Sequence, residues 1–219
     1  MADGTLALVG AGEFLPAMRE IDAELLKRCG GTRVVVLPTA STPDGAEVPK
    51  RWATMGVDHF RALGADTEAV MALDREGCGE RVNVEAVRRA DFVYFSGGKP
   101  DYLLAALRDT PLWEAALGVF ERGGVLAGCS AGAMILGGWI PGRSSMQGLA
   151  FWQEAFGLVP GTVIFPHFDE IPALLTGLLR LLRPRGSKVV GIDGGTALIG
   201  RPGQWEVRGR GRVHGIPEG

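Results

Sequence analysis

A serine set between two glycines is the first residue of this chain that suggests chemistry. It lies in Gly128-Cys129-Ser130-Ala131-Gly132, a G-x-S-x-G pattern. The apolar residues 125–127 before it predict a buried strand, and the small and apolar residues 131–136 after it predict the start of a buried helix. A strand that turns directly into a helix at this pattern exposes the serine hydroxyl at the carboxyl end of a sheet. We therefore expect Ser130 to be a nucleophile, although a glycine-rich turn without chemistry is the plainer alternative.

A serine hydroxyl needs a neighbouring base, and the chain offers three histidines. His167 follows a predicted strand in a Pro-His-Phe loop and is the preferred base. His59 lies within a predicted helix, where a surface or packing role is more common, and His214 lies in a predicted C-terminal hairpin region with no loop that favours catalysis. We expect His167 to take the proton of Ser130.

The acid that would orient His167 is less well defined. Asp193 ends the predicted strand that follows, so we expect it beside His167 at the sheet edge. An Asp-Gly pair is equally typical of a plain turn. Asp169 and Glu170 are so close to His167 in sequence that exposure to solvent, or capping of the next helix, is favoured for them.

Acyl transfer also needs two donors for the oxyanion that forms on the carbonyl. The backbone N–H of Ala131 is expected to supply one. The second is expected from Gly98, in the loop after another predicted strand, because residues without side chains let a backbone approach a substrate closely. Gly97 is expected to contact the substrate there, and a plain strand–helix turn is the alternative for this loop.

Other chemistries are less well supported. An elbow turns the residue before its nucleophile into the protein, so Cys129 is expected to be a small buried side chain. The three histidines are scattered without metal-ligand spacing, so we expect neither a metal nor another cofactor.

The elements that must position these residues alternate between strands and helices, which predicts one α/β domain over residues 1–219 with a mostly parallel sheet, helices on both faces and a short antiparallel C-terminal extension. In such sheets, sites form beyond the carboxyl ends of the strands. Six residues fall just after predicted strands: Glu13, Thr39, Gly97, Ser130, His167 and Asp193. Residues 138–157 are rich in glycine and are expected to be irregular.

Composition narrows the class of protein. Hydrophobic residues make up 46% and charged residues 22% of the 219 residues, which is typical of a soluble domain with a real core. The net charge of −2 and the lack of a Lys/Arg cluster argue against a nucleic-acid partner. No apolar run approaches the ~18 residues of a membrane span. Three cysteines at irregular spacing and an N-terminus without a signal-peptide pattern predict free thiols in a cytoplasmic protein.

Three motifs together resemble one family. The elbow, the upstream Phe95-Ser96-Gly97-Gly98 and the downstream Pro166-His167-Phe168 are similar to the serine peptidase family of aspartyl dipeptidase (peptidase E) and cyanophycinase. The resemblance runs from residue 8 to residue 198 and implies a class I glutamine amidotransferase-like fold. It assigns Ser130 as nucleophile, His167 as base and Gly98 and Ala131 as oxyanion donors.

One position departs from the family pattern. The third catalytic residue of the family is a glutamate shortly after the last core strand, and Gly194 stands at that position here. The favoured repair is Asp193, one residue earlier. Asp169 or Glu170 folding back is a second possibility, and loss of peptidase activity is a third.

The resemblance implies a short-peptide substrate, with dipeptides that begin with aspartate preferred. A cation would read the acidic side chain, and Arg143 and then Lys99 are the candidates, although both are also typical of solvated surface charges. A cyanophycinase-like hydrolase of β-aspartyl-arginine peptides and a non-catalytic binding or regulatory protein are the alternatives. A homodimer is compatible with the resemblance, because dimers are common in this fold.

Overall fold

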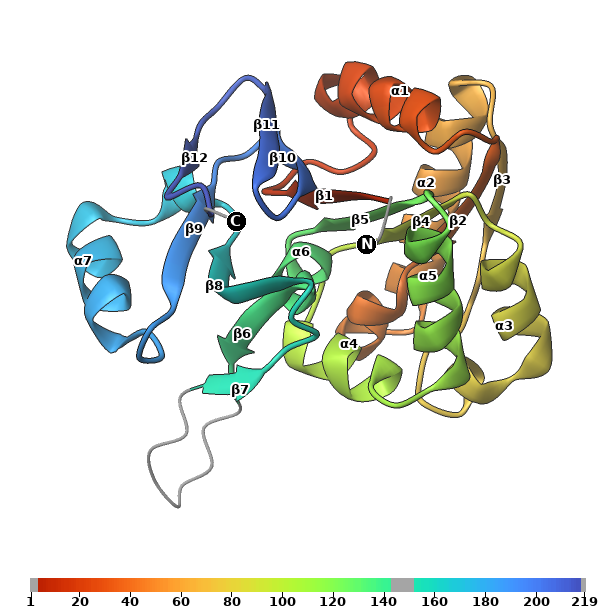
Figure 1. The fold of residues 1–219 in the computed structure, drawn as a ribbon. Coiled ribbons are helices and arrows are strands. Elements are labelled where there is room, and N and C mark those ends of the chain that lie inside the picture. The colour runs from red at the N-terminus through yellow and green to blue at the C-terminus, as the bar shows by residue number, and fades with distance from the viewer. Residues whose placement is uncertain (1–3, 143–151, 218–219) are drawn as a thin grey trace.

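The computed structural model describes residues 4–142 and 152–217, and a seven-stranded sheet with helices on both faces forms its centre (Figure 1). The strand order is β11-β10-β1-β5-β4-β2-β3. The strands from β1 to β5 run parallel to one another, and their bounds are β1 (Thr5–Val9), β2 (Arg33–Leu37), β3 (Asp66–Ala69), β4 (Phe92–Phe95) and β5 (Val125–Cys129). This arrangement confirms the predicted mostly parallel α/β sheet.

Side chains that alternate along each strand enter two different cores, as the two-residue period of a strand requires. On β4, Phe92 and Tyr94 face the core under α1 (Arg19–Arg28) and α2 (Glu47–Ala62). Val93 and Phe95 face the core on the other side of the sheet. That second core contains α3 (Arg81–Arg88), α4 (Pro100–Leu107), α5 (Pro111–Glu121) and α6 (Ala131–Leu136). Burial on both faces explains why these strands are continuously apolar.

A second sheet of mixed direction packs beside the first, in the order β12-β9-β8-β6-β7. Its strands are β6 (Gly137–Pro141), β7 (Trp152–Glu154), β8 (Val159–Phe165), β9 (Lys188–Ile192) and β12 (Val213–His214), and α7 (Ala173–Leu182) lies between β8 and β9 in the chain. The expectation of irregular chain over residues 138–157 is therefore wrong for β6 and β7. These two strands exist because β6 pairs with β8 and β7, and such pairing leaves no periodic pattern in a short glycine-rich segment.

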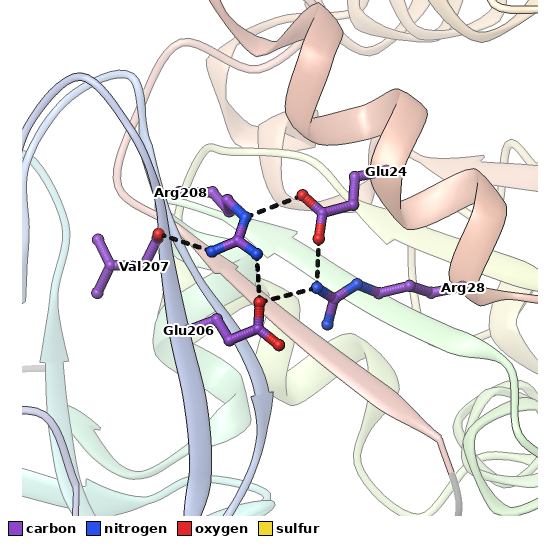
Figure 2. Close-up of polar contacts among 5 residues, drawn as sticks. All are labelled: Glu24, Arg28, Glu206, Val207 and Arg208. Atoms are coloured by element: carbon purple, nitrogen blue, oxygen red, sulfur yellow. Dashed lines mark hydrogen bonds and ion pairs between the residues drawn. The ribbon is translucent and has the colours of Figure 1, made fainter.

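The C-terminal strands β10 (Thr196–Arg201) and β11 (Gln204–Gly209) are antiparallel, as expected, but they do not form a separate extension. β10 pairs with β1 and so belongs to the central sheet. Figure 2 shows how the edge strand β11 is tied to α1 by alternating charges. Arg28 lies 3.1 Å from Glu206, and Nε of Arg208 lies 3.0 Å from Glu24. These ion pairs fasten the edge strand to α1.

Four 3₁₀ turns complete the described elements: η1 (Pro16–Met18), η2 (Thr39–Asp44), η3 (Gly77–Gly79) and η4 (Phe168–Glu170). In the part of the chain that the structure describes, no helix combines the length and the apolar character that a membrane crossing requires. The parallel strands point their carboxyl ends at the loops that carry Glu13, Gly97 and Ser130, so these residues meet at one edge of the sheet.

Candidate active site

The predicted elbow is present at the junction of β5 and α6. Ser130 has φ 51° and ψ −112°, a backbone conformation that costs energy for a residue with a side chain and persists only where the surroundings enforce it. The two flanking glycines allow the close approach. A Cβ at Gly128 would lie 2.2 Å from the carbonyl carbon of Gly132, and a Cβ at Gly132 would lie 2.3 Å from the carbonyl oxygen of Phe95.

A cavity of about 540 Å³ opens above the elbow. It brings together Ser130, His167 and the Gly97-Gly98 loop, which come from three separate strand ends. Among the described residues its lining is Gly12, Glu13, Leu15, Asp44, Val48, Arg51, Trp52, Gly97, Gly98, Ser130 and His167. Small-molecule sites in proteins fall in a range of about 300–1,000 Å³, so a short peptide is of suitable size.

The backbone N–H groups of Gly98 and Ala131 are available beside Ser130. The N–H of Ser130 itself donates to the carbonyl of Val9 at 3.0 Å and cannot serve an oxyanion. Within the described residues, neither Gly98 nor Ala131 donates its N–H to another protein atom. Gly98 has φ 145°, and a Cβ there would lie 2.3 Å from the carbonyl oxygen of Ala40, so only glycine fits this position.

His167 lies two residues after the end of β8, in the left-handed conformation with φ 51° and ψ 37°. Its Nδ1 lies 3.5 Å from Oε1 of Glu170, and the two side chains are 43% and 72% exposed. Among the residues that the structure describes, no hydrogen bond joins His167 to Ser130. Catalytic hydrogen bonds are often long without substrate and tighten when it binds.

Asp193 does not take the place expected for it beside His167. One of its carboxylate oxygens lies 3.1 Å from Nε2 of His214, and the other accepts the Arg212 N–H at 2.8 Å. The His214 ring contacts Phe168 in a tilted arrangement, with ring centroids 4.7 Å apart and an interplanar angle of 38°. Asp193 therefore fastens β12 against the end of β9. His214, for which the sequence indicated no role, has a structural one.

Gly194, which stands where the resemblance expects the catalytic acid, contacts Asp169. Its N–H donates to Oδ1 of Asp169 at 2.8 Å. A Cβ at Gly194 would lie 3.6 Å from Oδ2 of Asp169, an ordinary contact. The turn that follows His167 is thus held to the chain after β9 by Asp169, whereas Glu170 is the carboxylate that faces the imidazole.

Of the two cations expected to read an acidic substrate, only Lys99 lies in the described part of the chain, and it does not line the cavity. Lys99 pairs with Asp44 at 3.3 Å, and Arg143 lies outside the described residues. The lining instead contains Arg51, whose guanidinium carbon lies 5.9 Å from the centre of the Trp52 ring. The sequence does not single out Arg51 or Trp52, because both belong to the first turns of α2. The feature of the sequence that points to these two residues is the loop before α2, because that loop follows β2 at the same edge of the sheet.

A buried carboxylate, Glu13, is part of the cavity lining, and the sequence placed it at this edge of the sheet without a defined role. Its side chain accepts hydrogen bonds from Gly97 N–H and from the thiol of Cys129, at 2.8 Å and 2.9 Å. Burial, and then the charge of Glu13, raise the pKa of Cys129 well above its ordinary value. Cys129 is fully buried, as expected, and a thiol held protonated is a poor nucleophile, which favours Ser130.

No cluster of three or more His, Cys, Asp or Glu side chains suited to a metal ion occurs in residues 4–142 and 152–217.

Comparisons with known proteins show what this chain is similar to. The model of Peptidase family S51 matches residues 6–207. A solved peptidase from an acI-B1 Actinobacterium is 34% identical, with a TM-score of 0.86 over 99% of this chain and 91% of that one. A candidate peptidase E protein from Listeria monocytogenes has the same fold, with a TM-score of 0.70 at 21% identity over 95% of this chain and 99% of that one. No curated protein matches the chain.

Proposed function

The chain belongs to peptidase family S51, and we propose that it is a serine dipeptidase that removes an N-terminal aspartate from short peptides. The observation that carries this proposal is the strained elbow of Ser130, which faces the same cavity as His167 and the Gly98 loop. A nucleophile, a base and a glycine loop meet there from separate strand ends, as acyl transfer requires.

Each residue then has a defined step. Oγ of Ser130 attacks the peptide carbonyl carbon while His167 takes the hydroxyl proton. The N–H groups of Gly98 and Ala131 stabilise the negative charge that develops on the carbonyl oxygen. His167 next gives its proton to the leaving amine, and the C–N bond breaks. A water molecule, activated by the same imidazole, hydrolyses the acyl-enzyme and frees Ser130.

We assign the orienting acid to Glu170, because it is the carboxylate in contact with His167, and we assign a structural role to Asp193. Glu170→Gln is expected to lower kcat by about tenfold, well below the ~10⁴-fold loss known for a buried orienting acid, because this side chain is 72% exposed. Asp193→Asn, the matched change, is expected to lower the denaturation midpoint. Its loss of kcat should be smaller than that of Glu170→Gln. Steady-state kinetics and urea unfolding of both variants check this assignment, and a larger loss of kcat in Asp193→Asn would reverse it.

We assign recognition of the acidic side chain of the substrate to Arg51, the cation that the described part of the chain contributes to the cavity lining. A guanidinium binds a carboxylate through two parallel hydrogen bonds, and its stacking on Trp52 limits the conformations it must give up.

The test is release of free aspartate from Asp-Leu, compared with Asn-Leu and β-aspartyl-arginine. We expect the wild type to cleave Asp-Leu fastest. Arg51→Ala is expected to reduce the preference for Asp-Leu over Asn-Leu by roughly 10- to 100-fold, the value of one charged hydrogen-bonded pair. Lys99→Ala is the matched control, because that ammonium is already paired with Asp44.

Two outcomes would favour the alternatives. Cleavage of β-aspartyl-arginine without cleavage of Asp-Leu would indicate a cyanophycinase-like enzyme. Hydrolysis of every peptide no faster than by Ser130→Ala would indicate a non-catalytic member of the family.

A further inference from the structure

Glu13 is an acidic residue in a place where charged side chains are rarely found. It follows β1 in Gly10-Ala11-Gly12-Glu13 and is only 6% exposed. No positively charged group is paired with it among the residues that the structure describes. A buried charge is tolerated only where hydrogen bonds compensate for the lost water, so the partners of this carboxylate indicate why it is there.

The first partner is the loop that carries Gly98. Oε1 of Glu13 accepts the N–H of Gly97, a contact between residues 84 positions apart. On either side, Ser96 N–H donates to the carbonyl of Leu37 and Lys99 N–H donates to that of Ala40, at 3.1 Å and 2.8 Å. Three of the four N–H groups in this loop are therefore fixed, and the one between them, on Gly98, is left for a ligand.

The second partner is the elbow. Oε2 of Glu13 accepts from the thiol of Cys129, two residues before Ala131. A Cβ at Gly97 would lie 2.8 Å from Oε1 of Glu13 and 3.3 Å from Cβ of Ser130, so the three segments are in close contact. One carboxylate thus bridges the two segments that supply the two expected oxyanion donors.

We propose that Glu13 is a positioning residue that sets the spacing of the Gly98 and Ala131 N–H groups. A carboxylate suits this task because it only accepts, and its two oxygens can serve two donors at once. Hydrogen bonds to a charged acceptor are also stronger than neutral ones, which holds the loop firmly. This role rests on the proposed serine chemistry, but it does not depend on which peptide is cleaved.

The decisive comparison is between Glu13→Gln and Glu13→Met. Both remove the charge and keep a side chain of similar length, but only glutamine retains an oxygen that can accept from Gly97. Glu121→Ala, at the exposed end of α5, controls for the loss of a carboxylate elsewhere. Thermal unfolding of each variant shows that it is folded before its kinetics are measured.

Two readouts separate positioning from substrate binding. The first is kcat and KM for Asp-Leu, and the second is the rate at which a small alkyl fluorophosphonate labels Ser130, followed by intact mass. In that labelling a Ser130 Oγ–P bond forms, fluoride leaves and His167 takes the proton, so no substrate ammonium is involved. We expect Glu13→Met to lower both kcat and the labelling rate by roughly 10²-fold, as loss of an oxyanion donor does, with KM nearly unchanged. Glu13→Gln is expected to recover at least tenfold of that loss.

Distinct results would overturn the role of Glu13 or the function beneath it. If the wild type is labelled and folded Glu13→Met is labelled equally fast, Glu13 does not position the donors. A rise in KM at constant kcat and labelling rate would make Glu13 a substrate-binding residue instead. If Glu13→Met does not fold, a Glu13→Gln variant that loses as much as 10²-fold in labelling would overturn the acceptor argument. Failure of the wild type in both assays would refute the serine hydrolase itself, and Glu13 with it.

Discussion

Ser130→Ala is expected to lower kcat for Asp-Leu by at least roughly 10³-fold, because removal of the nucleophile from a serine triad leaves only the catalysis supplied by binding and the oxyanion donors. The variant keeps the backbone N–H groups of Gly98 and Ala131, so it should still bind the dipeptide. Turnover assays measure the loss, and calorimetric titration of Asp-Leu into the variant measures the retained affinity.

Ser187→Ala is the matched serine control, since that hydroxyl only donates to the carbonyl of Pro184 in a distant turn. It should leave kcat unchanged. If Ser130→Ala kept more than a tenth of the wild-type kcat, the covalent route through Ser130 would be wrong, and His167 acting on a water molecule would become the better mechanism. Retained affinity with lost turnover would place the effect of Ser130 on the chemical step alone.

Of the substitutions proposed here, Gly128→Ala is expected to lower the free energy of unfolding the most, by about 3 kcal/mol or more. Overpacking of a close contact usually costs about 1–3 kcal/mol, and no flexible side chain can move aside at this position. The added Cβ would lie 2.2 Å from the carbonyl carbon of Gly132 and 2.3 Å from its oxygen. Relief requires α6 to move away from β5, which would displace Ser130 and Ala131 as well. Urea unfolding should show a lower midpoint, and activity should fall with it.

Gly177→Ala provides the matched glycine control. Gly177 lies within α7, and a Cβ there would meet nothing within 4 Å. The same substitution should therefore stabilise the protein by about 0.5–1 kcal/mol, the usual gain in a helix interior. An unchanged midpoint for Gly128→Ala would show that α6 yields easily, and the elbow would then not be held rigidly by its glycines.

Local patterns were sufficient for the two elements that form the elbow. The predicted strand over residues 125–127 lies within β5 (Val125–Cys129), and the predicted helix over residues 131–136 is α6. Both are continuous apolar runs ended by glycine or a loop, and burial on both faces makes such runs unambiguous. β6 and β7 could not be found in this way, because each is a strand only by virtue of its neighbour.

The sequence by itself determined the parallel sheet, the turn that exposes Ser130 and the strand end that carries His167, because glycine spacing and apolar periodicity act over a few neighbouring residues. Only the tertiary structure decided which charged groups meet. It paired Asp193 with His214, set Glu170 against His167 and joined Glu13 to Gly97 across 84 positions. A carboxylate has the same local pattern whichever partner it finds, so its role depends on which chain segments folding brings within hydrogen-bond distance.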